Sequence, residues 1–281
     1  MSKVIYVDKP EGITSFDVCY KLRKVFNTKA IGHTGTLDPL ASGVMIVLVD
    51  KATKANQFLV GDDKEYVAKV VYGYQTDTLD KDGKIIKKED FKTPDPKDLN
   101  AVLDSYIKTY DQEPPLTSAI KVKGKKLYEY QRQGLSVEIP KRKVTIYDMT
   151  LLEAKDDGFS FKVKVSSGTY IRSLIRDILD DLGLIGTLVS LRRISVGSIE
   201  VKDCDKLDTI LEGRYHTHSL YDVLASRYEV YEFEDDKAIR NGKKIKIDTP
   251  NDEVLIAKDK IALAIYRRED KDIFRSSRGL F

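Results

Sequence analysis

The 281-residue chain is poor in residues that bind metals or form covalent cross-links, with two cysteines and three histidines. Cys19 and Cys204 are too few for a disulfide framework or a four-cysteine zinc site, which is typical of a reducing compartment. Residues 1–12 lack the apolar core of a secretion signal, and no apolar run approaches the roughly 20 residues of a membrane-spanning helix. These absences predict a cytoplasmic protein that makes no membrane contact.

The sequence also lacks a strong excess of charge of one sign. Its 48 Lys and Arg residues nearly balance its 45 Asp and Glu residues, and 41% of all residues are hydrophobic, which indicates a folded globular chain. The net charge of +3 is low for a nucleic-acid-binding protein. Between Lys121 and Lys143, however, eight basic residues stand against two acidic ones, and Tyr128 and Tyr130 lie among them. This segment is typical of an RNA contact; the alternative is a solvated loop.

The stretch from residue 32 to residue 43 contains three glycines, His33 and a single carboxylate, Asp38. Its glycine spacing matches neither a phosphate-binding loop nor a dinucleotide-binding motif, and its serine lacks the preceding glycine of a nucleophile elbow. Pro39 disfavours the helical conformation for Asp38, so the carboxylate is held in extended geometry. The apolar run 44–49 predicts a buried strand directly afterwards. The stretch therefore presents one positioned aspartate; the alternative is an ordinary Asp-Pro turn.

Hydrophobic periodicity predicts further elements. Strands are expected over residues 4–7, 66–72, 159–165, 254–257 and 261–266. Helices are expected from Ser15 as the capping residue, over 99–106, and over 171–182 with Gly183 at the end. Asp77, Asp80 and Asp82 lack the spacing of an EF-hand loop and are interpreted as polar loop residues.

Five stretches resemble motifs of the TruB family of pseudouridine synthases, in the expected order. The most specific is Gly32-His33-Thr34-Gly35-Thr36-Leu37-Asp38-Pro39 followed by Ala41-x-Gly43. The others are Asp8-Lys9-Pro10-x-Gly12-x-Thr14-Ser15; Lys64-Glu65-Tyr66 with Thr76-Asp77-Thr78; Pro114-Pro115-x-x-Ser118-Ala119-x-Lys121 with Gly124-Lys125-Lys126-Leu127-Tyr128; and Ser167-Gly168-Thr169-Tyr170-Ile171-Arg172 with Leu191-Arg192-Arg193. Together they cover about residues 4–199. Met45 and Ile194 depart from residues common in the family, at positions outside the implied chemistry.

The resemblance implies an α+β fold with two domains. Residues 1–225 would form a catalytic domain with a large mixed or antiparallel sheet, flanking helices and an RNA-contacting insertion at about residues 113–143. Residues 226–281 would form a small, mostly β domain that resembles the RNA-binding PUA domain. The twelve basic and twelve acidic residues between Tyr228 and Phe281 cancel, so charge alone does not assign this segment to RNA binding.

The resemblance further implies that the protein isomerises the uridine at position 55 in the T-arm loop of tRNA to pseudouridine. The uracil would leave ribose C1′ at N1 and return at C5, by base flipping and without a cofactor or metal. Asp38 would be the nucleophile or ribose-side carboxylate, Arg172 would keep it ionised, and Tyr66 would stack on the flipped base and assist proton transfer. The route of attack, at ribose C1′, at uracil C6 or by elimination, stays open.

The same resemblance implies the groups that bind the RNA. Tyr170 would line the pocket, Leu191 would close the opposite face of the uracil, and His33 would touch the RNA where the arm is opened. Four lysines would contact phosphates, which position RNA without reading its sequence: Lys9, Lys64, Lys125 and Lys126. The expected partner is the T-arm stem-loop of tRNA, with no obligatory protein partner.

Two alternatives share these motifs. A guide-RNA-dependent pseudouridine synthase is disfavoured by the insertion at 113–143 and by the short C-terminal segment. A non-catalytic RNA-binding or RNA-folding protein has no need for an intact set of Asp38, Tyr66 and Arg172. The sequence therefore predicts a stand-alone tRNA-modifying isomerase.

Overall fold

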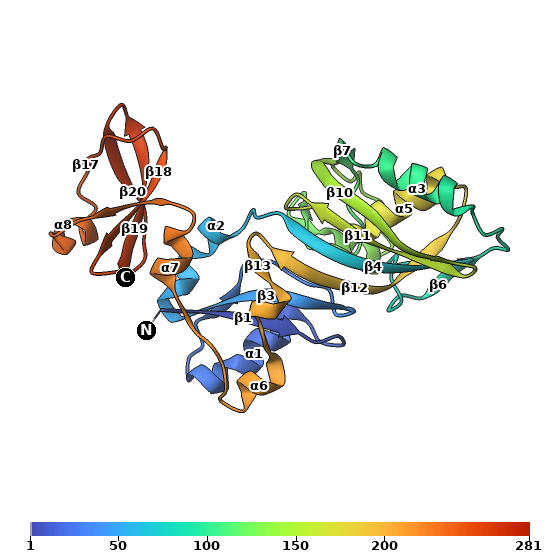
Figure 1. Cartoon of the computed structure of the whole chain (residues 1–281), viewed down its shortest axis with the longest axis horizontal. Helices are drawn as coiled ribbons and strands as arrows, with labels where there is room; N and C mark the ends of the chain where they lie inside the picture. The colour runs from blue at the N-terminus through green and yellow to red at the C-terminus, as the bar shows by residue number, and fades with distance from the viewer. Residues whose placement is uncertain (1) are drawn as a thin grey trace. The chain divides into compact units, whose positions relative to one another are not determined.

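The computed structural model describes residues 2–281 and has an α+β fold (Figure 1). The chain divides into two compact units. Unit 1 contains the residues up to Asp38 together with Val44–Val60 and Lys202–Phe281, and unit 2 contains Pro39–Gly43 and Gly61–Val201. Within residues 2–281, no helix is long and apolar enough to cross a membrane. The predicted fold class, α+β with a large mixed sheet and flanking helices, is confirmed.

Unit 1 is built on strands that bury an apolar core. Its elements before the C-terminal sheet are β1 (Lys3–Lys9), α1 (Ser15–Phe26), β2 (Ile31–His33), most of β3 (Ala41–Val49), η1 (Asp50–Ala55), α2 (Asn56–Leu59), the end of η2 (Val201–Asp203), β14 (Asp205–Lys206), α6 (Leu207–Leu211), β15 (His218–Ser219) and α7 (Leu220–Ala225). β1 pairs parallel with β14 and antiparallel with β15, and β2 pairs antiparallel with β3. The predicted strand 44–49 is confirmed and buried throughout, as expected for a run without polar residues.

Helix α1 begins one residue away from the predicted cap. Thr14 is the capping residue: its hydroxyl accepts from the Asp17 amide at 3.0 Å, and the Asp17 carboxylate accepts from the Thr14 amide at 2.9 Å. This reciprocal pair satisfies two amides that a helix start leaves free. The prediction that Ser15 caps the helix is therefore wrong. The buried Ser15 side chain instead hydrogen-bonds to the backbone of Leu37.

The C-terminal residues of unit 1 form a separate five-stranded sheet. Its elements are β16 (Glu229–Glu232), α8 (Asp236–Arg240), β17 (Ile245–Lys246), β18 (Glu253–Lys258), β19 (Ile261–Asp270) and β20 (Ile273–Gly279), with the strand order β16-β18-β19-β20-β17. The sheet buries its own cluster, which includes Val254, Ile256, Tyr266 and Phe274. The predicted strands 254–257 and 261–266 are confirmed, whereas the domain boundary at residue 225 stays a prediction.

Unit 2 is an antiparallel sheet covered by helices. Its elements are β4 (Lys64–Tyr72), β5 (Tyr74–Thr76), β6 (Ile85–Lys88), α3 (Pro96–Ser105), β7 (Thr109–Gln112), β8 (Lys121–Val122), β9 (Lys125–Lys126), α4 (Leu127–Arg132), β10 (Arg142–Lys155), β11 (Gly158–Val165), α5 (Ile171–Asp181), β12 (Gly186–Val196) and β13 (Ile199–Glu200). The strand order is β12-β4-β11-β10-β7, and the first residues of β3 add a parallel pair to β12. α3 packs against β10, and α5 packs against β12. The predicted strands and helices of this region are confirmed, with ends shifted by a few residues.

The glycine of the Ala41-x-Gly43 motif is required by the pairing of β3 with β12. Gly43 has φ +106°, a conformation that side chains other than glycine rarely adopt. A Cβ atom at this position would also lie 2.1 Å from the backbone oxygen of Arg193. Glycine therefore permits the register in which Ala41 lies beside Leu191.

Candidate active site

The backbone around Asp38 is fixed within unit 1. The Ser15 hydroxyl accepts a hydrogen bond from the Leu37 amide at 2.9 Å and donates one to the Leu37 carbonyl at 3.0 Å, and both side chains are buried. Pro39 limits the Asp38 backbone from the other side. The half-buried Asp38 therefore sits between two restrained residues, as a positioned carboxylate requires. His33 lies nearby in the sequence, half-buried in β2 and paired with Val47.

Tyr66 and Leu191 lie on the same face of the unit 2 sheet. Tyr66 is opposite Arg193, and Leu191 is opposite Ala68, in the antiparallel pair of β4 and β12. Residues directly opposite each other in an antiparallel pair point to the same face of the sheet. Tyr66 and Leu191 are therefore diagonal neighbours on one face, and the Cα atoms of such neighbours are about 7–8 Å apart. Both side chains are buried. The structure thus brings together the two residues expected to hold the base.

Helix α5 follows the end of the sheet at which β4 begins with Lys64. β11 pairs with β4 through Val163 opposite Tyr66 and Val165 opposite Lys64, and the chain then turns into α5. The Lys64 ammonium lies 3.5 Å from the Ser167 hydroxyl in that turn. Tyr170, the N-cap of α5, is half-buried. Three predicted site residues, Lys64, Tyr66 and Tyr170, therefore lie at one end of the unit 2 sheet, and Leu191 lies further along it, opposite Ala68.

Arg172 points into unit 2 and is held by two loops. Its guanidinium donates to the Thr78 carbonyl at 2.9 Å, to the Thr117 hydroxyl at 2.7 Å and to the Thr117 carbonyl at 3.2 Å. It also lies 3.4 Å from the Asp80 carboxylate, and both charged side chains are buried. A guanidinium with this many fixed acceptors has one orientation. Arg172 is therefore a buried, oriented side chain and not an exposed residue of an amphipathic helix.

Asp80 is a residue that the sequence interpretation missed. Its carboxylate accepts from the Thr78 hydroxyl at 2.6 Å and from the Asp82 amide at 3.2 Å, in addition to the Arg172 ion pair. The interpretation of Asp80 as a polar loop residue is wrong because this loop folds inward around the carboxylate. The available signal was its position two residues after the Thr76-Asp77-Thr78 motif.

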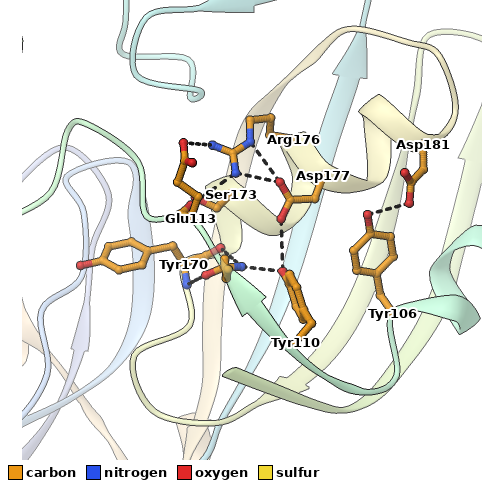
Figure 2. A network of polar contacts seen from close by, with 9 residues as sticks. Tyr106, Tyr110, Glu113, Tyr170, Ser173, Arg176, Asp177 and Asp181 are labelled. Atoms are coloured by element: carbon orange, nitrogen blue, oxygen red, sulfur yellow. Dashed lines mark hydrogen bonds and ion pairs between the residues drawn. The ribbon is translucent and has the colours of Figure 1, made fainter. Parts of the chain in front are cut away.

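A buried amide side chain of strand β7 fixes the start of α5 by joining Tyr170 and Tyr110, both labelled in Figure 2. Gln112 Oε1 accepts from the Tyr170 amide at 2.8 Å, and Gln112 Nε2 donates to the Tyr170 carbonyl at 3.2 Å and to the Tyr110 hydroxyl at 2.8 Å. Tyr170 has no side-chain capping bond of its own. Gln112 therefore replaces the missing cap and fixes the backbone that carries Tyr170 and Arg172.

The next turn of α5 is attached to the end of β7. The Ser173 hydroxyl donates to the Glu113 carbonyl at 2.7 Å, and Arg176 donates to the same carbonyl at 3.3 Å (Figure 2). Arg176 also pairs with Asp177 at 2.8 Å. These contacts connect α5 to the beginning of the insertion, so the helix that carries Arg172 cannot rotate independently of it.

Burial keeps the tyrosines of this network protonated. Burial is the main cause that raises the pKa of Tyr110, and the nearby Asp177 raises it further. Burial likewise raises the pKa of Tyr106, whose hydroxyl donates to Asp181 at 2.7 Å. The pKa of Asp177 is also raised by burial, against the opposing effect of Arg176. The tyrosine hydroxyls therefore remain hydrogen-bond donors to α5 even well above neutral pH.

Replacing Gln112 with alanine is expected to lower the free energy of unfolding by about 1–3 kcal/mol, because buried polar groups of Tyr170 lose their partner. Urea titration followed by circular dichroism measures the loss. The matched control is Asn100→Ala, which removes an exposed hydrogen bond to Asp104 in α3 and is expected to change stability by less than about 0.5 kcal/mol. Equal unfolding free energies of the two variants would contradict the role given to Gln112.

The expected phosphate-binding lysines occupy different environments. Lys125 in β9 is exposed, whereas Lys126 is half-buried beside Tyr128, with its ammonium 5.4 Å from the ring centre. Lys9 is fully buried, and its ammonium donates to the Pro10 carbonyl at 2.8 Å. Because a buried ammonium does not reach a phosphate on the surface, we leave Lys9 out of the proposed RNA contacts.

Known proteins resemble this chain over most of its length. The model of the TruB family pseudouridylate synthase N-terminal domain matches residues 23–171. The tRNA pseudouridine synthase B of Mesoplasma florum is 36% identical over 99% of this chain and 98% of its own length. The enzyme of the same name from Fusobacterium nucleatum is 48% identical over 72% of this chain and 70% of its length, and that from Clostridium tetani 38% over 88% and 86%.

Solved structures show the same fold at low sequence identity. A structure described as an H/ACA RNP bound to a substrate RNA containing 2′-deoxyuridine aligns with a TM-score of 0.73 at 21% identity, over 99% of this chain and 85% of that one. A Cbf5-Nop10-Gar1 complex aligns with a TM-score of 0.72 at 23% identity. The family model matches more than half of the chain, and relatives that align along nearly the whole chain are more than 30% identical to it. The chain belongs to the TruB family of pseudouridylate synthases.

Proposed function

We propose that this pseudouridine synthase acts on tRNA and isomerises the uridine at position 55 in the T-arm loop. The observation that carries the proposal is that Lys64, Tyr66, Tyr170, Arg172 and Leu191 all belong to unit 2, with Tyr66 and Leu191 as diagonal neighbours on one face of its sheet. The curated relatives named tRNA pseudouridine synthase B support tRNA as the substrate. In the reaction, the N1–C1′ bond breaks, the C5–C1′ bond forms, C5 loses its proton and N1 gains one.

The proposed handling of the base follows from the arrangement of the sheet. A uridine in a folded tRNA arm must leave its stack to reach a catalytic group. Tyr66 and Leu191 share one buried face, so an aromatic ring and an aliphatic side chain are available to hold the two faces of the uracil. Stacking on Tyr66 contributes about 1–3 kcal/mol. Tyr170 is proposed to line the same pocket, and His33 is proposed to contact the RNA.

The proposed chemistry requires an ionised carboxylate. Asp38 is the candidate, because its loop is anchored through Ser15 and Leu37. A carboxylate removed from water loses its charge more readily, and a neighbouring guanidinium restores the ionised form. We propose Arg172 for this role because the family resemblance implies it; within unit 2 its guanidinium contacts Thr78, Thr117 and Asp80.

Release of tritium from C5 tests the reaction directly. An unmodified tRNA transcript carrying uridines tritiated at C5 is incubated with the protein, and released tritium is counted. We expect about one equivalent per tRNA, because forming the C5–C1′ bond expels the C5 hydrogen. A transcript with cytidine at position 55 is expected to release none. No release from either transcript, with tRNA binding retained, would instead support a guide-dependent or non-catalytic protein.

The basic segment is expected to contact tRNA phosphates through Lys125 and Lys126. Replacing both with alanine is expected to lower the slope of log affinity against log salt by about 1 for each lost contact. Filter binding of tRNA between 50 and 200 mM salt measures this slope. Lys155→Ala is the matched control, since Lys155 already pairs with Glu153 at 3.0 Å. A slope in the double variant equal to that of the control would refute the phosphate contacts.

A further inference from the structure

The outer face of α1 exposes two large aromatic side chains. The inner face of the helix buries Val18, Cys19 and Leu22, as its periodicity requires. Phe16 and Tyr20 lie on the other side and are 62% and 63% exposed. Aromatic rings normally bury most of their large apolar area, so two such rings one turn apart indicate a surface that is covered in a complex.

The guanidinium of Arg23 lies close to both rings. Its guanidinium carbon lies 5.8 Å from the Phe16 ring centre and 5.6 Å from the Tyr20 ring centre. The spacing of three and four residues along a helix places the three side chains on one strip. Arg23 Nε is buried and has no hydrogen-bond partner within residues 2–281. The guanidinium therefore lies against the two ring faces, and its buried Nε is out of reach of another molecule.

The cations around this strip are not neutralised. An open pocket of about 730 Å³, within the size range of ligand sites, is lined by Tyr20, Arg23, Lys24 and Lys29 and by no acidic residue. In the part of the chain that the structure describes, the side chains of these three cations form no ion pair. In the C-terminal sheet of the same unit, by contrast, Lys244 pairs with Glu269 at 2.6 Å. Unpaired like charges repel each other, and a bound anion removes that repulsion.

We propose that this α1 surface, defined as Phe16, Tyr20, Arg23, Lys24 and Lys29, binds an RNA strand with at least one unstacked base. The base stacks on an exposed ring, and the following phosphates contact the cations. Rings beside basic groups are the combination that single-stranded RNA recognition uses, whereas an acidic protein segment needs only the cations. The proposal rests on the proposed function only in taking the tRNA substrate as the source of the strand.

The absence of tryptophan gives a direct reporter for this surface. Tyr20→Trp places a single tryptophan on it, and Leu152→Trp places one at a 52% exposed position in β10 as the matched control. Titration with tRNA is expected to quench the fluorescence at position 20 and to leave that at position 152 unchanged. Quenching at position 20 by polyglutamate and not by tRNA would overturn the proposal in favour of an acidic protein partner.

Affinity measurements separate this surface from the proposed catalytic residues. Tyr20→Ala is expected to weaken tRNA binding about tenfold, and Lys24→Ala/Lys29→Ala to lower the salt slope by about 2. Lys155→Ala is the control and is expected to change neither, because Lys155 already pairs with Glu153 at 3.0 Å. At saturating tRNA the tritium-release rate of these variants is expected to equal that of wild type. Unchanged affinity and slope would overturn the proposal, whereas a wild-type protein that binds tRNA but releases no tritium would overturn the proposed function instead.

Discussion

Replacing Asp38 with asparagine is expected to lower the rate of pseudouridine formation by about 10⁴-fold, because the amide keeps the shape of the side chain and loses its charge and nucleophilicity. The bonds between Ser15 and Leu37 hold the loop without involving the Asp38 side chain, so the backbone is expected to stay in place. Single-turnover tritium release at saturating tRNA measures the chemical step. The tRNA dissociation constant and the urea midpoint are expected to stay close to wild type.

Two further substitutions show whether the loss of rate comes from the Asp38 carboxylate itself. Asp259→Asn is the control: it removes a carboxylate from an exposed turn with φ +50°, a conformation that asparagine tolerates, and is expected to leave the rate unchanged. Asp38→Glu keeps the charge and moves it by one methylene group, so an intermediate rate is expected if the carboxylate attacks a carbon atom. Tritium release by Asp38→Asn at the wild-type rate would remove Asp38 from the mechanism.

Elements set by local periodicity were predictable, and contacts between distant segments were not. The apolar run 44–49 and the helical spacing after Tyr170 each identify an element without reference to the rest of the chain. The Ser15 hydroxyl, by contrast, bonds a residue 22 positions away, and Gln112 bonds one 58 positions away. Both polar side chains fit local roles, a cap and a strand residue, so nothing in their own neighbourhoods indicated the longer connection.

The burial of two charged residues, Lys9 and Asp80, was also not predictable from the local sequence. Lys9 carries the charge of a surface residue but ends a strand whose alternate positions, including Val7, are buried, and the strand carries its side chain into the interior. Asp80 lies in a segment with two other acids, which is typical of a solvated loop. Its burial depends on Arg172 reaching it from α5, a pairing that no spacing rule connects. The family motifs identified Arg172, and only the fold identified the carboxylate beside it.

Substitutions that break the Arg172–Asp80 ion pair are expected to have the second largest effect, because they lower both stability and activity. Arg172→Met is expected to lower the unfolding free energy by about 3–5 kcal/mol, because a buried carboxylate loses its cation. Arg172→Met/Asp80→Leu removes both charges and fills the space with apolar atoms, so most of that loss is expected to return. Activity is not expected to return, since the guanidinium assigned to Asp38 is missing in both variants. Urea unfolding of both variants and of Asp80→Leu completes a double-mutant cycle.

The cycle separates structural from catalytic contributions of Arg172. A coupling of about 0.5–3 kcal/mol between the two positions would show that Asp80 acts on stability through the guanidinium, beyond the contacts of Arg172 with Thr78 and Thr117. Additive effects would mean that these threonine contacts alone hold the side chain. Restored stability with tritium release still lost would assign Arg172 to the chemistry, because a purely structural residue recovers function together with the fold. Recovery of both in the double variant would refute its catalytic role.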